Sequence, residues 1–146
     1  MRTLLIGPKN SGKMTVASLI EGSEKPLKKV ANIVYYKKTI IVPDSYLESP
    51  WMHKHLIALQ QSAFCGIFLQ PLGAKKRSYP PNFAKVFRIP IHGVLTYQKQ
   101  YTKSNLENAS QQLFDCGINQ IDLLFDLTKD NYDQIEKLIG RGEEDE

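Results

Sequence analysis

Gly7-Pro8-Lys9-Asn10-Ser11-Gly12-Lys13, followed by Met14-Thr15, is the stretch that decides how this chain folds. Its spacing is that of the phosphate-binding loop, G-x-x-x-x-G-K, whose backbone N–H groups surround phosphate oxygens while the lysine reaches the outer phosphates. The residue after the lysine is Ser or Thr in that motif, because its hydroxyl ligates Mg²⁺. Here it is Met14, and Thr15 lies about 100° further around the helix, which makes it a poor substitute. The stretch therefore predicts a nucleotide phosphate site with a damaged metal site.

The residues on either side of the loop have the periodicity that the motif requires. Arg2 to Ile6 is a short apolar run typical of a strand, and Val16, Leu19 and Ile20 repeat at helical spacing before Gly22. A strand, a glycine-rich loop and a helix in this order direct backbone N–H groups and a helix N-terminus at one point. A chance glycine turn is the alternative, and the flanking elements make it the weaker one.

Strands alternate with helices along most of the remaining chain. We predict strands at 30–36, 38–42, 64–70, 89–96 and 118–125, and helices at 50–62, 83–87, 104–116 and 130–139. This order predicts an α/β fold, a three-layer P-loop NTPase of the small-GTPase type with a mostly parallel six-stranded sheet and one antiparallel edge strand. Residues 1–139 are predicted to form one domain, and 140–146 an acidic disordered tail. The ligand is expected beyond the carboxyl ends of the strands.

Charge is distributed unevenly along the sequence. Residues 1–103 contain 16 Lys and Arg against 4 Asp and Glu, residues 104–146 contain 3 against 11, and the net charge is +4. A basic N-terminal part and an acidic C-terminal part favour docking to an acidic partner or head-to-tail self-association. Nucleic-acid binding is disfavoured, because no finger, helix-turn-helix or RNP-like aromatic motif accompanies the basic residues.

Hydropathy and cysteine content indicate the class of protein. No apolar run approaches 18 residues and a strand begins at the first residues, so we expect no membrane helix, signal peptide or N-terminal extension. Cys65 and Cys116 lie far apart in apolar segments, which fits buried, reduced thiols in a cytoplasmic protein.

The positions of the histidines and the tryptophan give little evidence for a metal or catalytic site. His53 and His55 are two residues apart on a predicted helix, so they face different directions and suit the surface better than a shared metal. His92 falls in a buried strand and is interpreted as a hydrogen-bonded core histidine. Trp51 fits a core residue and an exposed docking residue equally well.

Four stretches beyond the loop stand in a specific order and spacing: 28–36, Tyr46-Leu47-Glu48, Pro80-Pro81-Asn82-Phe83-Ala84 and 89–96. On these stretches and the loop, the chain resembles the EutP/PduV family over nearly its whole length. The resemblance implies a small P-loop GTPase-like protein linked to ethanolamine- and propanediol-utilising bacterial microcompartments. It also implies microcompartment shell proteins or enzymes as partners, and a location that is cytoplasmic and associated with microcompartments.

The sequence departs from the family at positions that hold metal, γ-phosphate and base. The family pattern Asp-Thr-Pro-Gly, with its metal-holding aspartate and phosphate-sensing glycine, falls on Ile41-Val42-Pro43-Asp44. The guanine-reading Thr-Lys-x-Asp falls on Thr96-Tyr97-Gln98-Lys99, so a lysine replaces the aspartate. Thr96, Tyr97 and Lys99 remain the candidate base-side residues. Only Thr15 and Asp44 are left as weak metal candidates, so Mg²⁺ binding is not expected.

Two functions follow, and the sequence leaves the choice between them open. The first is a P-loop protein that binds ATP, GTP or another phosphate-bearing ligand and has weak or lost hydrolysis, a pseudoenzyme that acts through docking. The second is an active ATP- or GTP-dependent enzyme, either an NTPase that recruits Asp44, Glu48 or Thr15 to the metal or a phosphotransferase acting on a small carboxylate such as acetate. A carboxyl oxygen of Asp44 near the phosphates would favour the second.

Overall fold

A six-stranded sheet forms the centre of the protein, in a computed structural model that describes residues 1–23, 27, 31–129 and 131–144. The strand order is β2-β3-β1-β4-β5-β6, and every neighbouring pair is parallel except the antiparallel pair β2–β3 at one edge. The strands are β1 (Arg2–Ile6), β2 (Val34–Tyr35), β3 (Thr39–Ile41), β4 (Ala63–Pro71), β5 (Ile91–Tyr97) and β6 (Ile121–Asp126). The predicted fold class, including its single antiparallel edge strand, is confirmed.

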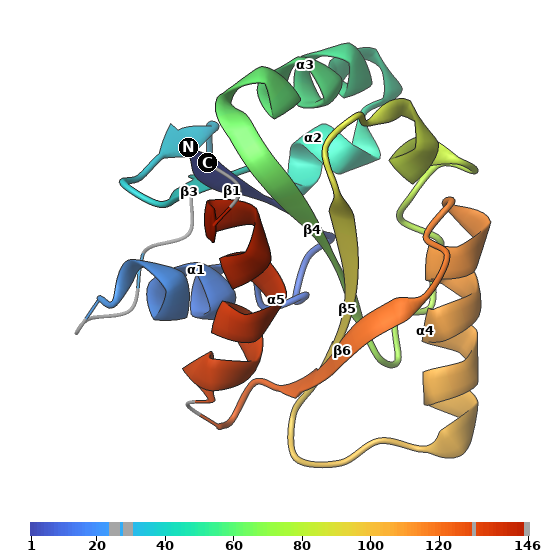
Figure 1. Ribbon diagram of the computed structural model, residues 1–146. Helices are drawn as coiled ribbons and strands as arrows, with labels where there is room; N and C mark the ends of the chain where they lie inside the picture. Colours follow the sequence, from blue (N-terminus) through green and yellow to red (C-terminus); the bar gives the residue numbers. More distant parts are fainter. Residues whose placement is uncertain (24–26, 28–30, 130, 145–146) are drawn as a thin grey trace.

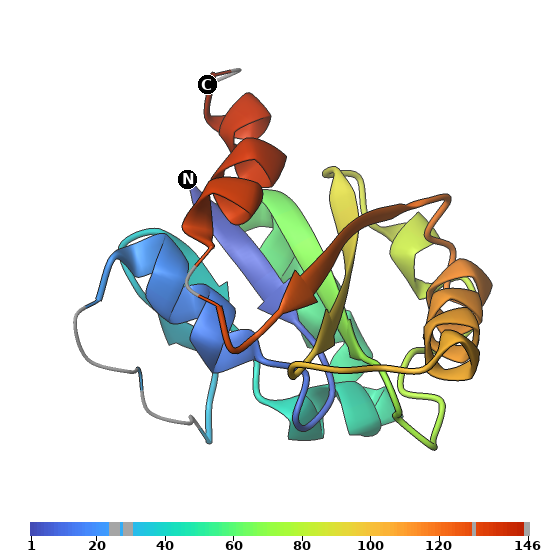
Figure 2. The ribbon, with the colours of Figure 1, turned by 90° about the horizontal axis from the view of Figure 1, so that it is seen from below.

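Helices cover both faces of this sheet, which makes three layers (Figure 1). In Figure 2, α1 and α5 lie on one side of the sheet and α4 lies on the other. The α-helices are α1 (Lys13–Glu21), α2 (Asp44–Glu48), α3 (His53–Ala58), α4 (Lys103–Asp115) and α5 (Tyr132–Glu144). Short 3-10 helices among the described residues are η1 (Pro50–Met52), η2 (Leu59–Ser62) and η3 (Phe83–Val86).

Side chains of the central strands alternate between two apolar clusters, one on either face of the sheet. On β1, Leu4 and Ile6 pack into the cluster that contains α2, α3 and α4 residues, while Leu5 packs with α1 and α5. Phe68 and Leu69 on β4 divide in the same way. Because successive strand residues point to opposite faces, the continuous apolar runs in the sequence are what a sheet covered on both sides needs.

Several predicted boundaries are wrong in ways that short-range signals explain. The predicted helix at 50–62 is divided into η1, α3 and η2, with tighter 3-10 turns at both ends. The five-residue helix α2 was not predicted, because such a short segment shows no helical period. Of the strand predicted at 30–36, only Val34–Tyr35 forms a strand among the described residues. Residue 30 lies outside the described residues.

Two helix ends also differ from the prediction. Helix α4 begins at Lys103, one residue before the predicted start, and is capped by Thr102, whose hydroxyl accepts a hydrogen bond from the Asn105 backbone N–H at 3.0 Å. Helix α5 continues to Glu144, beyond the predicted end at Ile139. The division into a domain at 1–139 and an acidic tail at 140–146 stays a prediction.

The Tyr79 hydroxyl joins the two strands that end beside the glycine-rich loop. It lies within hydrogen-bond distance of the carbonyl oxygens of Ile6 (3.0 Å) and Leu69 (2.7 Å), and the residue is 3% exposed. Burial, with a smaller contribution from Cys116, raises the pKa of Tyr79 well above its ordinary value, so the hydroxyl keeps its proton. Ile6 directly precedes Gly7, so this hydrogen bonding fixes the point where the loop begins.

Tyr79→Phe should therefore lower the free energy of unfolding by about 1–2 kcal/mol, because two buried carbonyls lose a donor. Urea unfolding followed by circular dichroism measures this loss. Tyr101→Phe, which removes a hydroxyl from a residue 42% exposed, is the matched control and should change stability by less than about 0.5 kcal/mol. Equal stability of the two variants would show that the Tyr79 hydroxyl does not hold these strands.

Candidate functional site

The loop between β1 and α1 has the backbone geometry of a phosphate cradle. Asn10 and Gly12 have φ values of 65° and 87°, in the left-handed region that glycine tolerates best. A Cβ added at Gly12 would lie 2.5 Å from a Leu127 side-chain carbon, so a larger residue there would be strained in its backbone and would also have to displace Leu127. The Val16 N–H donates to the Gly12 carbonyl and starts α1 directly after the loop.

Lys13 points back under the loop and meets the end of β3. Its Nζ donates to the carbonyl oxygens of Gly7 and Val42, both at 2.8 Å, and the side chain is only 8% exposed. The Asp44 Oδ1, at the start of α2, lies 3.7 Å from the same Nζ. The carbonyls of the residues that directly follow β1 and β3, and the carboxylate of the first residue of α2, thus lie around the ammonium.

A cavity of about 180 Å³ lies between the loop and the end of β3. It is lined by residues 8–15 and 41–44. Lys9 is exposed and Met14 packs partly against the core, so neither side chain fills the cavity. Of the predicted loop residues, Pro8 to Thr15 border it and Gly7 does not. The Ser11 hydroxyl is buried and has no hydrogen-bond partner within the described part of the chain, which is costly unless a ligand supplies one.

A second cavity, of about 730 Å³, adjoins the first on the side where a base is expected. Lys9, Asn10, Gly12 and Thr15 border both cavities, which makes them neighbours. The rest of the larger wall includes Thr96, Tyr97, Gln98, Tyr101 and Leu127. A volume of this size suits a small organic ligand.

The three predicted base-side residues have different surroundings. Thr96 is buried, and its hydroxyl donates to the Ser11 carbonyl at 2.8 Å, so it supports the loop. Tyr97 borders the larger cavity, with its ring 4.7 Å from that of Tyr101. Lys99 borders neither cavity. It has a φ of 64°, and its N–H donates to Asp126 Oδ1 at 3.3 Å.

Asp126 is a turn carboxylate. Its Oδ1 also accepts hydrogen bonds from the Thr128 hydroxyl (2.7 Å) and N–H (2.9 Å), and these bonds lower the pKa of Asp126. A carboxylate occupied in this way closes the loop after β6, and Asp126 is not among the residues that border the larger cavity.

The residues at the phosphate cavity do not fit Mg²⁺. This ion demands octahedral oxygen ligands, and Met14 offers a thioether where a hydroxyl is needed. Of the described residues that border the cavity, Asp44 alone carries a carboxylate, and it faces the Lys13 ammonium. Thr15 is exposed at the rim. In the described part of the chain, no group of three or more His, Cys, Asp or Glu is placed to hold a metal.

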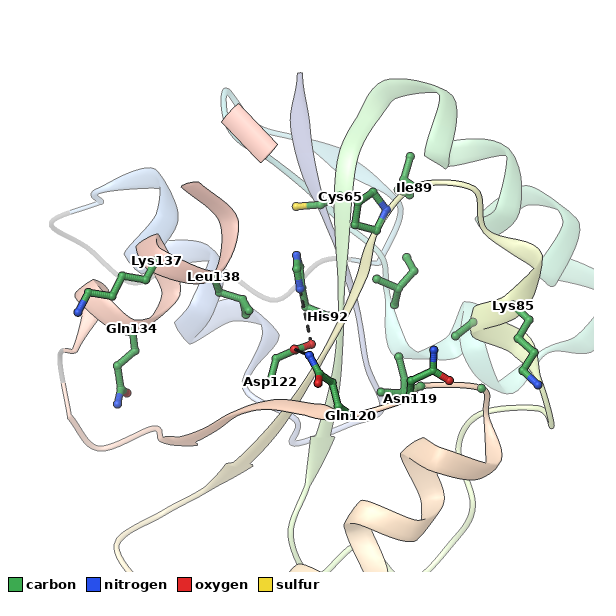
Figure 3. A pocket seen from close by; sticks show the side chains of 15 residues that line it. Cys65, Lys85, Ile89, His92, Asn119, Gln120, Asp122, Gln134, Lys137 and Leu138 are labelled. Carbon is green, nitrogen blue, oxygen red and sulfur yellow. Dashed lines mark hydrogen bonds and ion pairs between the residues drawn. The ribbon is translucent and has the colours of Figure 1, made fainter. Parts of the chain in front are cut away.

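A further cavity, of about 940 Å³, opens at the opposite edge of the sheet, at the amino ends of β4, β5 and β6 (Figure 3). His92 and Asp122 face each other there, with Nδ1 and Oδ2 3.6 Å apart. The same carboxylate accepts from the Gly93 N–H at 3.1 Å. Burial lowers the pKa of His92, and Asp122 opposes that shift. His92 is thus a half-buried histidine beside a carboxylate at the rim of a cavity, not a core residue.

His53, Trp51 and the two cysteines lie outside the two cavities beside the loop. His53 is half-buried, with its Nε2 2.8 Å from the Leu47 carbonyl and its ring beside Phe83, so the prediction of a surface histidine is wrong. Trp51 is 73% exposed, and the thiols of Cys65 and Cys116 are buried as predicted. Burial raises the pKa of Cys116 to about 11, which keeps this thiol protonated and unreactive.

Comparison with known proteins assigns the chain to a family. The family model described as "Ethanolamine utilisation - propanediol utilisation" matches residues 1–141. The chain belongs to the PduV–EutP family. It is 23% identical over 120 residues to the propanediol utilization protein PduV of Citrobacter freundii, covering 82% of this chain and 80% of that protein.

Solved structures confirm the fold. The crystal structure of a probable GTP-binding protein, EngB, aligns over 100% of both chains, with a TM-score of 0.62 and 14% identity. Translation elongation factor SelB from Methanococcus maripaludis aligns over 97% of this chain and 34% of its own, with a TM-score of 0.57 and 10% identity. The protein therefore has a GTPase-like fold. Among the described residues, no helix has the length and apolar character needed to cross a membrane.

Two residues of the site were missed or underrated by sequence reasoning. Tyr79 lies in a loop without period or motif, so nothing in the sequence indicates that its hydroxyl reaches β1 and β4. Asp44 was a weak metal candidate, and its position beside Lys13 depends on the short helix α2. The sequence signal that could have indicated this contact is a carboxylate two residues after the predicted strand at 38–42, because the carboxyl ends of parallel strands lie near one another.

The stability of the fold should depend on the ionisation of His92. Because burial lowers its pKa in the folded state below the ordinary value of about 6.5, the unfolded chain binds the proton more readily. Stability is then highest above that pH and falls as the pH drops below about 6.5. Urea unfolding between pH 7.5 and 5.0 should show a weaker pH dependence for His92→Gln than for the wild type.

His55→Gln is the matched control, since His55 is exposed, and it should retain the pH dependence of the wild type. Asp122→Asn should steepen the loss toward acid pH, because the carboxylate that favours the protonated imidazole is gone. Parallel curves for His92→Gln and wild type would contradict this role of His92.

Proposed function

We propose that this PduV–EutP family protein binds nucleotides through Gly7–Thr15 without Mg²⁺-dependent hydrolysis. The observation that carries the proposal is a buried Lys13 ammonium beside a cavity that the loop borders and that has space for a ligand. The unsatisfied Ser11 hydroxyl supports it, because this residue lines the same cavity. Loop N–H groups and the N-terminus of the nine-residue helix α1 would supply the remaining positive potential.

The nucleoside is proposed to lie in the larger adjoining cavity. Tyr97 and Tyr101 present aromatic rings there, and stacking on aromatic rings accepts every base. With Lys99 at the position of the guanine-reading aspartate, the site lacks the acceptor that would select guanine. We therefore expect ATP and GTP, or ADP and GDP, to bind with similar affinity.

We also propose a cytoplasmic role in ethanolamine or propanediol utilisation, exerted by docking to shell proteins or enzymes of a microcompartment. The family description supports the pathway. Trp51, 73% exposed just after the Tyr46-Leu47-Glu48 stretch, is a candidate contact for such a partner. Within that stretch Leu47 is buried, so only Tyr46 and Glu48 remain to contribute.

A second candidate function is an NTPase or phosphotransferase, favoured by one observation. Asp44 borders the phosphate cavity, which is where a carboxylate could join a metal to a nucleotide. Its ion pair with Lys13 weighs against this function, because the carboxylate already neutralises the ammonium. Mg²⁺-dependent turnover that Asp44→Asn abolishes would establish the enzyme.

Isothermal titration of ATP, ADP, GTP and GDP, with Mg²⁺ and with EDTA, tests the proposal. We expect binding that survives EDTA and that Lys13→Ala weakens at least tenfold, about 1.4 kcal/mol, because the charge beside the phosphates is lost. Lys54→Ala, on the exposed face of α3, removes the same charge from the surface and should bind as the wild type does.

Thermal unfolding of each variant accompanies the titration, because Lys13 is buried and its removal leaves Asp44 without its cation. Lys13→Met, which keeps the bulk of the side chain, is the second variant if the alanine variant unfolds. Binding that requires Mg²⁺, together with phosphate release, would contradict the proposal and favour the enzyme.

A further inference from the structure

Asp44 lies where the ammonium of the phosphate-binding loop would meet an outer phosphate. In a loop of this kind the lysine reaches the β- and γ-phosphates. Here two of the acceptors around Lys13 Nζ are the Gly7 and Val42 carbonyls, and the charge that faces it, at 3.7 Å, is the Asp44 carboxylate. The carboxylate thus presents a fixed negative oxygen to the ammonium, as a phosphate oxygen would.

The backbone holds this carboxylate in place. The Val42 N–H donates to the Leu5 carbonyl at 3.3 Å, which ties the end of β3 to β1. Pro43 follows with a φ of −59°, and the Tyr46 N–H donates to its carbonyl at 3.0 Å to start α2. Asp44 is the first residue of that helix and its side chain is 20% exposed. The backbone position of Asp44 is therefore fixed by its attachment to the sheet.

The space left beside Lys13 is small. The phosphate cavity of about 180 Å³ is bordered on one side by the loop and on the other by residues 41–44, whereas the adjoining nucleoside cavity has about 730 Å³. A further phosphate extending from the loop toward β3 meets the Asp44 carboxylate. Like charges at such separations disfavour each other strongly. Met14 supplies no hydroxyl to hold a metal ion that would offset this repulsion.

We propose that Asp44 occupies the place of the γ-phosphate and makes the site selective for nucleoside diphosphates over triphosphates. This inference rests on the proposed nucleotide binding and specifies which class of nucleotide the site prefers. The β-phosphate lies in the loop, against the backbone N–H groups and Lys13, while Asp44 completes the charge around the ammonium. A triphosphate has to displace Asp44 from Lys13 before its last phosphate fits.

Titration of ADP against ATP, both in EDTA, on wild type and Asp44→Asn is the test. We expect ADP to bind the wild type at least tenfold more tightly than ATP. Asp44→Asn, which keeps the size and removes the charge, should reduce that ratio to about threefold or less, mainly through tighter ATP binding. Glu48→Gln, on the same helix but exposed, is the matched control and should keep the wild-type ratio.

Pyrophosphate and tripolyphosphate repeat the comparison without a base and should show the same selectivity. If the wild type binds ADP and ATP equally, or if Asp44→Asn leaves their ratio unchanged, the inference is overturned and nucleotide binding stands. If neither the wild type nor Asp44→Asn binds any of the four probes, both the inference and the proposed function are overturned.

Discussion

The ion pair between Lys13 and Asp44, backed by two carbonyls, is the constraint on which the site depends. An ammonium that is 8% exposed has lost most of its water and needs acceptors from the protein. The Gly7 and Val42 carbonyls and the Asp44 carboxylate supply them, and they come from three different elements. One buried charge thereby fixes the glycine-rich loop against the end of β3.

The sheet delivers these groups to one point because its strands are parallel there. β1, β3 and β4 end side by side, so Gly7, Val42 and the Leu69 carbonyl meet beneath the loop. Tyr79 reaches two of these strand ends from a distant loop. Thr96, at the end of β5, supports Ser11 from the other side. The strands that hold the loop are therefore in place, whereas the side chains expected of a metal-dependent site are replaced: Met14 stands in place of the hydroxyl, Ile41 in place of the aspartate and Asp44 in place of the glycine.

Much of the fold could be predicted from the sequence, because its signals are local or periodic. The apolar runs of β1, β4 and β5 and the G-x-x-x-x-G-K spacing require no knowledge of the tertiary structure. Short elements carried no such signal, as α2 and the divided helix at 50–62 show. The contacts of Tyr79 and Asp44 join residues 73 and 31 positions apart, and no local pattern encodes a contact of that kind. The sequence thus located the loop and named Asp44 as a weak metal candidate, but it did not show that Asp44 faces the lysine.

A crystal structure of the wild type grown with excess ADP and EDTA would test most directly that phosphate is bound here without metal. We expect the β-phosphate within the Gly7–Lys13 loop, contacting Lys13 Nζ, with the Asp44 carboxylate still beside the ammonium. A structure in which the loop stays empty, or in which added Mg²⁺ sits between Asp44 and the phosphates and releases Lys13, would contradict it.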